Sequence, residues 1–216
     1  MATSILAGQA SPAPLPPYTH HSKKLHYETG RNDFPAPVKI KGKFLRSYST
    51  WHNMLRRGYS ESFQAEYPFY KGCSVCEEWH SFSVFEAWFS ENYIEGMSLD
   101  KDILVPGNKI YSPETCVFIS KALNTLLADG GARRGDLPLG VCRHRQKYKA
   151  QVRDQNTSKH LGVFDTPLEA HRAYQLAKAK VIENFPTNDP RIRAALDLRV
   201  AQLRDDHANN RITTKL

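Results

Sequence analysis

Residues 139–185 read LGVCRHRQKYKAQVRDQNTSKHLGVFDTPLEAHRAYQLAKAKVIENF. Short runs at 139–144, 148–153 and 159–164 carry valine, tyrosine and phenylalanine, and tight polar turns separate them. Such runs are typical of β-strands joined by hairpins. The stretch therefore predicts a three-stranded antiparallel meander.

The middle run, 148–153, alternates between apolar and polar side chains. Because successive side chains of a strand point to opposite faces, its tyrosine, alanine and valine share one face and its polar residues share the other. The apolar set is Tyr148, Ala150 and Val152, and the polar set is Lys149, Gln151 and Arg153. We expect the first face to pack and the second, cationic face to remain accessible.

The residues after the third run contain a clear signal for the start of a helix. Thr166 is the expected N-cap, Pro167 suits the first helical position, and Glu169 completes a capping box. Small and apolar residues then recur at helical spacing, at Ala170, Ala173, Tyr174, Ala177 and Val181. The alanines allow this helix to lie close against the apolar face of the sheet.

These residues resemble the ethylene-response-factor (APETALA-type) DNA-binding domain. The matching fragments are GV at 140–141, YKAQVR at 148–153, LGVFDT at 161–166, EAHRAY at 169–174 and NFP at 184–186. The resemblance implies that the sheet enters the major groove of DNA, which is wide enough to admit strands and displays the full base-pair code.

The family's contacts fall on Gln151 and Arg153 of the second strand and on Ser158 and His160 of the third. On the first strand they fall either on Cys142 and His144 or on Arg143 and Arg145, because the first turn is one residue shorter here. Cys142 and Leu139 stand where the family has arginines, so its base preference does not carry over. The predicted DNA-binding residues are Arg143, His144, Arg145, Lys147, Lys149, Gln151, Arg153, Lys159 and His160.

Composition agrees with an anionic partner. The 216 residues carry a formal charge of +8, and the sequence pI is near 9.3. Lysines and arginines placed against phosphates release counterions, which favours nucleic-acid binding. A hydrophobic content of 40% is sufficient for a folded core. No apolar run is long enough to span a bilayer, and we expect a protein without membrane association.

Residues before the sheet divide into several segments. Residues 1–36 are rich in proline and are expected to form a flexible or loosely docked arm. Residues 38–45 alternate like a strand, and a helix is expected after Ser49 or Thr50 as N-cap, ending near Gly58. Aromatic residues then recur at helical spacing and are expected in a core: Trp79, Phe82, Phe85, Trp88 and Phe89.

Residues 48–127 resemble bacteriophage proteins of the HNH (homing) endonuclease lineage, which often carry an ethylene-response-factor domain behind the nuclease. The resemblance rests on WHNMLRR at 51–57, CEEWHSFSVF at 76–85 and SLDKDILVPGNKIYSPETC at 98–116. It implies a ββα-metal fold with one divalent cation, Mg²⁺ or Mn²⁺, and the cytoplasm of a bacterial host as the location.

By motif position, Asp100 is the strand ligand of the metal and Asn124 the helix ligand. Asn108 braces the loop, and Lys101 stands where the family has its general-base histidine. A lysine ammonium is a poor base at neutral pH unless burial changes it, so catalysis stays open. The alternative for this stretch is a hairpin turn formed by residues 106–108.

Cys73 and Cys76 have a C-x-x-C spacing, but no second pair of ligands follows at a similar spacing. A zinc site that recruits His80 is the alternative. We expect small buried thiols in a reducing compartment instead of zinc.

The sequence thus predicts a mixed α+β protein, with a degenerate ββα-metal (HNH-like) module before a three-stranded antiparallel sheet packed on one helix. The expected segments are an arm at 1–36, the nuclease-like module at 37–128, a linker at 129–138, the DNA-binding domain at 139–186, and a C-terminal helix and tail at 187–216.

The predicted function is sequence-directed binding of double-stranded DNA, with metal-dependent nicking or cleavage by the first module. One alternative is a non-catalytic regulator that keeps the nuclease scaffold as a second DNA clamp. Another is a protein-interaction module whose basic sheet binds an acidic protein.

Overall fold

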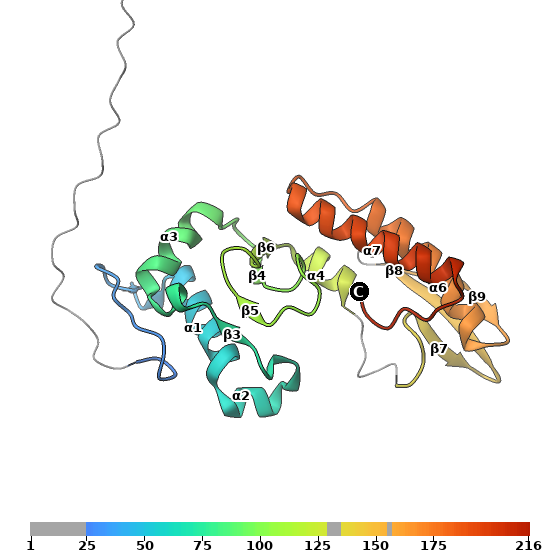
Figure 1. Cartoon of the computed structure of the whole chain (residues 1–216), viewed down its shortest axis with the longest axis horizontal. Helices are drawn as coiled ribbons and strands as arrows, with labels where there is room; N and C mark the ends of the chain where they lie inside the picture. Colours follow the sequence, from blue (N-terminus) through green and yellow to red (C-terminus); the bar gives the residue numbers. More distant parts are fainter. Residues whose placement is uncertain (1–24, 129–134, 155–156) are drawn as a thin grey trace, which may run out of the picture.

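The computed structural model describes residues 25–128, 135–154 and 157–216. It is a mixed α+β protein, as the sequence predicts, and its elements follow one another along the long axis of the molecule (Figure 1). The first helices lie at one end, and the three-stranded sheet with two long helices lies at the other. Strands β4 and β6 and helix α4 lie between them.

The first end begins with a β-hairpin, β1 (Lys39–Ile40) and β2 (Lys43–Phe44). Lys41 and Gly42 form its turn, both with positive φ, as a two-residue turn of type I′ requires. Helix α1 (Arg46–Tyr59) begins after Leu45, earlier than Ser49 or Thr50, so the predicted cap was wrong. Leu45 provides no side-chain cap, and this is why the start left no signal in the sequence. Helix α2 (Glu61–Glu66) and the 3-10 turn η1 (Pro68–Tyr70) complete this end.

The middle of the chain contains short elements joined by loops. Strand β3 (Ser74–Val75) pairs in parallel with β5 (Ile110–Tyr111), and β4 (Ser98–Asp100) pairs antiparallel with β6 (Val117–Ile119). The 3-10 turn η2 (Glu77–His80) leads into α3 (Phe82–Asn92), which Ser81 caps. Helix α4 (Lys121–Leu127) follows β6 directly.

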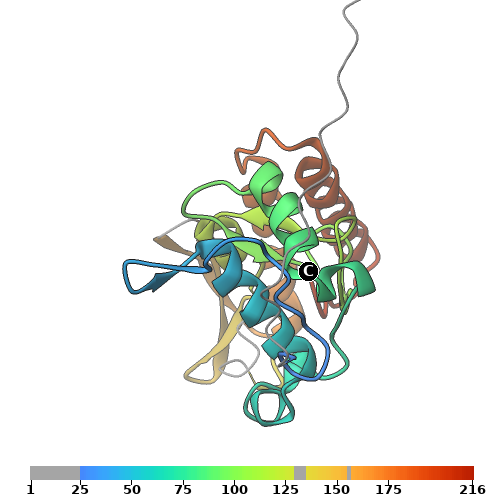
Figure 2. The ribbon, with the colours of Figure 1, turned by 90° about the vertical axis from the view of Figure 1, so that its left-hand side faces the viewer.

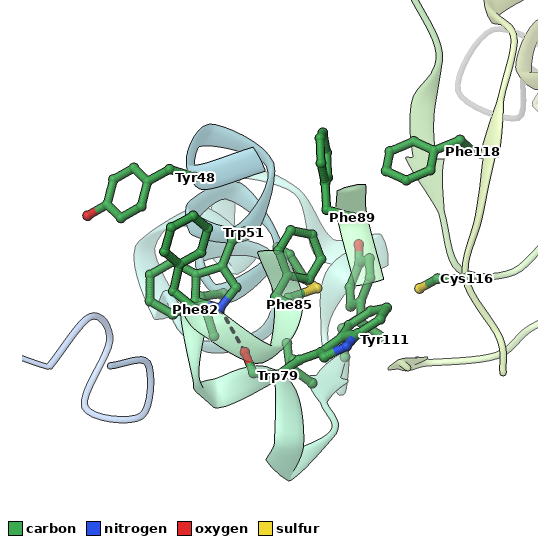
Figure 3. Close-up of a cluster of buried hydrophobic side chains, with 13 residues drawn as sticks. Tyr48, Trp51, Trp79, Phe82, Phe85, Phe89, Tyr111, Cys116 and Phe118 are labelled. Atoms are coloured by element: carbon green, nitrogen blue, oxygen red, sulfur yellow. Dashed lines mark hydrogen bonds between the residues drawn. The ribbon is translucent and has the colours of Figure 1, made fainter. Parts of the chain in front are cut away.

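Aromatic residues form the core of the first half (Figure 3). Trp51, Trp79, Phe82 and Phe85 are almost fully buried, and the helical spacing of the aromatics predicts this for the last three. The indole Nε1 of Trp51 donates to the carbonyl oxygen of Trp79 at 2.7 Å, so a polar group in this core is satisfied. These rings are therefore part of the core and cannot stack on bases.

Residues 25–36, which composition places in the arm, pack against this core; residues 1–24 lie outside the described part. Tyr48 Oη lies 3.1 Å from His26 Nε2, and the Arg31 amide donates to the His80 carbonyl. The Asp33 carboxylate accepts from the Ser81 hydroxyl and the Ser83 amide at the start of α3. This segment thus caps α3 from outside.

The C-terminal half contains β7 (Val141–His144), β8 (Lys147–Asp154) and β9 (Thr157–Phe164), paired antiparallel in that order. Helix α6 (Pro167–Glu183) covers one face of this sheet. Thr166 and Glu169 form the predicted capping box, with both hydrogen bonds present. The predicted meander and its covering helix are confirmed.

Helix α7 (Pro190–Ala208) packs beside α6 and extends the C-terminal half. The residues after it return along α6, where the Thr213 amide donates to His171 Nε2 and Gln175 Nε2 donates to the Arg211 carbonyl. None of the helices within the described ranges is long and apolar enough to cross a membrane.

A second core joins the two halves of the chain. The Lys178 ammonium on α6 donates to the Leu126 carbonyl at the end of α4. Apolar side chains from both halves form this core: Ile103, Val117, Ile119, Leu123 and Leu126 from one half, and Ala179, Ile182, Ile192, Leu196, Val200 and Leu203 from the other. Residues 98–128 and the C-terminal half therefore share a packed interface.

Candidate nucleic-acid interface

The sheet has one face against α6 and one face turned away from it. Ala150 and Val152 of β8 are buried, and they pack with Ala170 and Tyr174 of α6. The residues between and beside them must point to the opposite face because the strand alternates. That outer face carries Lys149, Gln151 and Arg153, and Arg153 is exposed.

Neighbouring strands add polar residues to this outer face. Cys142 pairs with Lys149, and His144 pairs with Lys147, on the β7 side. Gln151 pairs with His160, and Arg153 pairs with Ser158, on the β9 side. Of the two alternatives for the first strand, the register places Cys142 and His144 on the outer face.

Arg143 and Lys159 lie on the face that α6 covers. Arg143 pairs with Tyr148, and its guanidinium lies 5.8 Å from the centre of that ring. Lys159 pairs with the buried Val152 and makes a 2.8 Å ion pair with Asp154. Both are exposed at the margins of the sheet, but the pairing turns them away from the outer face.

Two predicted cations lie at the β7–β8 end of the sheet. Arg145 occupies the hairpin turn with φ of 56° and is exposed. Lys147 is exposed, and its ammonium forms an ion pair with the Asp165 carboxylate at 2.8 Å. The hydrogen bond within this ion pair raises the pKa of Lys147. Lys147 is therefore positively charged at neutral pH, although part of its charge is already compensated.

The second predicted site is the loop that follows β4. The Asp100 carboxylate accepts from the amides of Asp102 and Ile103, at 3.0 and 2.7 Å. The buried Lys101 donates to Asp102 Oδ2 at 2.9 Å and to the Asn108 carbonyl at 3.0 Å. Asn108 Nδ2 donates to the carbonyls of Lys101 and Ile110, so Asn108 fastens the loop.

Charge around Asp100 is unusually concentrated. Burial raises the pKa of Asp100, and the neighbouring Asp102 carboxylate raises it further, against the backbone hydrogen bonds that lower it. Arg199 of α7 is buried and donates to the Asp102 carbonyl at 3.4 Å. Its Nε atom is buried and has no hydrogen-bond partner within the described residues. Two carboxylates, Asp100 and Asp102, thus lie near two cations, Lys101 of the loop and Arg199 of α7.

Strands β4 and β6 form an antiparallel pair that α4 follows, with β5 between them in the sequence, and Asp100 is the last residue of β4. Asn124, the predicted helix ligand, is exposed on α4. Carboxylate oxygens are the ligands that Mg²⁺ and Mn²⁺ prefer, so Asp100 and Asp102 fit such a cation chemically. In the part of the chain that is described, no group of three or more His, Cys, Asp and Glu side chains could hold a metal.

The cysteines lie in the first core. Cys73 and Cys116 are buried, and burial raises the pKa of Cys116 to about 12 and that of Cys76 to about 11. The thiols of Cys76 and Cys116 are therefore protonated at neutral pH.

Arg199 was missed by sequence reasoning. It lies 97 residues from Asp102 in the sequence, on the C-terminal helix, to which the sequence assigned no site residue. No local pattern could have linked the two residues. Comparison with known protein families, with curated proteins and with solved structures found no match to this chain.

Proposed function

We propose that this protein binds duplex DNA through the outer face of the β7–β8–β9 sheet. The main support for this proposal is the pairing register of the three strands. It brings five polar residues together on the face opposite α6: His144, Lys149, Gln151, Arg153 and His160. Amide and guanidinium groups can read base edges, and the cations add sequence-independent attraction to phosphates.

The packed interface holds the first half in a fixed position beside the sheet domain, as a second DNA clamp requires. Lys101 and Arg199 already compensate charge in the Asp100 loop. This charge balance favours the regulator alternative, in which the scaffold binds but does not cut.

Anisotropy titrations with a labelled 20-base-pair duplex at 50, 100, 200 and 300 mM salt test the proposal. We expect the logarithm of the association constant to fall steeply with the logarithm of salt concentration, with a slope of about −3 or steeper. A flat dependence would instead support the alternative in which the sheet binds an acidic protein.

A metal-dependent nuclease is the second candidate, and it rests on the paired carboxylates of Asp100 and Asp102 beside β4. Asp100 and Asp102 would hold the cation, which would supply Lewis-acid stabilisation of the phosphate. The test is incubation of supercoiled plasmid with protein and Mg²⁺ or Mn²⁺. Nicks that disappear in Asp100→Ala, but persist in the surface control Asp197→Asn, support it.

The outcomes separate the candidates. Plasmid that stays supercoiled while duplex binding is retained supports the regulator. Equal nicking by wild type and Asp100→Ala would show a contaminating nuclease and would contradict the enzymatic role of this loop.

A further inference from the structure

An aromatic cluster lies on the surface of the first half, away from the sheet. Four rings from α2, η1 and the residue between them contact one another with centroid distances of 4.4 to 6.0 Å: Phe63, Tyr67, Phe69 and Tyr70. Unlike the aromatic residues of α3, they are not all buried. Phe69 exposes 63% of its surface and Tyr67 exposes 37%.

Two arginines of α1 hold this cluster in place. The Arg56 guanidinium lies 4.3 Å from the centre of the Phe63 ring, and the Arg57 guanidinium lies 5.3 Å from that of Tyr70. Phe63 and Tyr70 are half-buried, so they anchor the cluster on α1. We name Phe63, Tyr67, Phe69, Tyr70, Arg56 and Arg57 the aromatic ridge.

The backbone beneath Phe69 is also fixed. Lys109 Nζ donates to the Phe69 carbonyl at 2.6 Å, and Pro68 begins the 3-10 turn. Packing explains Phe63 and Tyr70, but it does not explain why the Phe69 ring is exposed on a backbone that Lys109 holds in place. Exposed apolar side chains that cluster on a surface mark binding sites.

The charges of the ridge indicate the occupant. Arg56 and the neighbouring Lys71 and Lys109 are exposed cations. Helix α2 also carries two exposed acids, Glu61 and Glu66, and Glu66 interacts with the Tyr67 hydroxyl. Rings bordered by cations suit a ligand with flat faces and a negatively charged backbone, which is the chemistry of unpaired nucleotides.

We propose that the aromatic ridge binds single-stranded nucleic acid, with an unpaired base stacked on Phe69 and phosphates beside Arg56 and Lys71. In a duplex, each base is stacked between its neighbours and its faces are covered. The ridge and the sheet would therefore bind different forms of nucleic acid, unpaired and paired. Helix α2 and the β7–β8 end of the sheet lie on the same, lower side of the molecule (Figures 1 and 2). One nucleic acid with paired and unpaired segments can extend along that side.

The test uses the full chain and a labelled 15-nucleotide oligothymidine. We expect Phe69→Ala to weaken oligothymidine binding by about fivefold or more, since one stacked base is lost, and to leave duplex binding within about twofold. The matched control is Phe44→Ala, which removes a ring that is 54% exposed and lies near Lys39. Phe44→Ala should change neither affinity, and thermal melting checks that both variants fold.

A second variant reports stacking directly. In the Phe69→Trp variant, the fluorescence of the new indole should be quenched when oligothymidine is added, because an exposed indole loses fluorescence when it stacks on a base. Equal oligothymidine affinity for wild type and Phe69→Ala overturns the proposal, as does an unquenched Phe69→Trp. A concentration-dependent dimer in sedimentation that Phe69→Ala dissociates would identify a second copy as the occupant and would also overturn it.

This proposal does not depend on the sheet. Arg153→Ala should weaken duplex binding and leave oligothymidine binding unchanged. The two proposals can therefore fail separately.

Discussion

Gln151 of β8 pairs with His160 of β9, although the residue before it, Ala150, pairs with Gly162. The register thus skips Leu161, which contacts the core on the α6 side. Without this bulge, Leu161 would pair with Gln151 on the outer face. The bulge therefore places His160 beside Gln151 and buries an apolar side chain at the same time.

Gly162 permits the bulge because its φ of 139° is rarely adopted by residues with a side chain. A Cβ atom there would also lie 3.1 Å from the Phe164 ring. Gly162→Ala is expected to lower the free energy of unfolding by about 1–3 kcal/mol, measured by urea denaturation. An unchanged free energy would show that the bulge does not depend on glycine.

Gly140 tolerates a side chain even less than Gly162 does. Its φ is +74°, and a Cβ atom would lie 1.9 Å from the Tyr174 ring, inside the contact between β7 and α6. Gly140→Ala should destabilise the fold by about 3 kcal/mol or more, because strain and steric overlap add.

The matched control for that substitution is Gly42→Ala. Gly42 has a similar φ of +80° but no atom within 4 Å of the added Cβ. The Gly42→Ala substitution should lower the free energy of unfolding by only about 1 kcal/mol. Equal losses at both positions would contradict the role of Tyr174.

Lys178 makes stability depend on pH. Burial lowers its pKa from 10.5 to about 8. The unfolded chain therefore binds more protons than the folded chain between these two values, so the contribution of Lys178 to stability rises with pH over that window. Below about pH 8 both states are protonated, and the cost of burying the charge is at its largest.

Comparison with Lys178→Met separates the contribution of Lys178 to the pH dependence of stability from the contributions of other titrating groups. The free energy of unfolding of wild type minus that of the variant should rise between pH 8 and 10, by at most about 1.4 kcal/mol per pH unit. Loss of the hydrogen bond to Leu126 shifts the difference by a constant. A difference that does not change with pH would show that Lys178 titrates normally.

Features with local causes were accessible from the sequence. The capping box of Thr166 and Glu169 depends on residues three positions apart, and the alternation in β8 depends on adjacent residues. The aromatic spacing also identified the buried Phe82 and Phe85. In each case the pattern that creates the structure is contained within a few residues.

Features with distant or conformational causes were not accessible. The bulge opposite Gln151 shifts the register of β9 by one residue. Strict alternation along β9 would therefore place Lys159 on the outer face, whereas the structure places it on the α6 side. Arg199 reaches Asp102 only because α7 packs on the first half. Composition likewise assigned residues 25–36 to an arm, whereas specific contacts such as that of Asp33 with Ser81 hold them in place.

The most direct test of duplex recognition compares two double variants with equal loss of charge. Lys149→Ala with Arg153→Ala alters the outer face, and Arg143→Ala with Lys159→Ala alters the α6 side. In salt-dependent duplex titrations, the outer-face variant should lose about tenfold or more in affinity, and its salt slope should fall by about 2. The α6-side variant should stay within about twofold. Equal losses for the two variants, or a larger loss on the α6 side, would contradict recognition by the outer face.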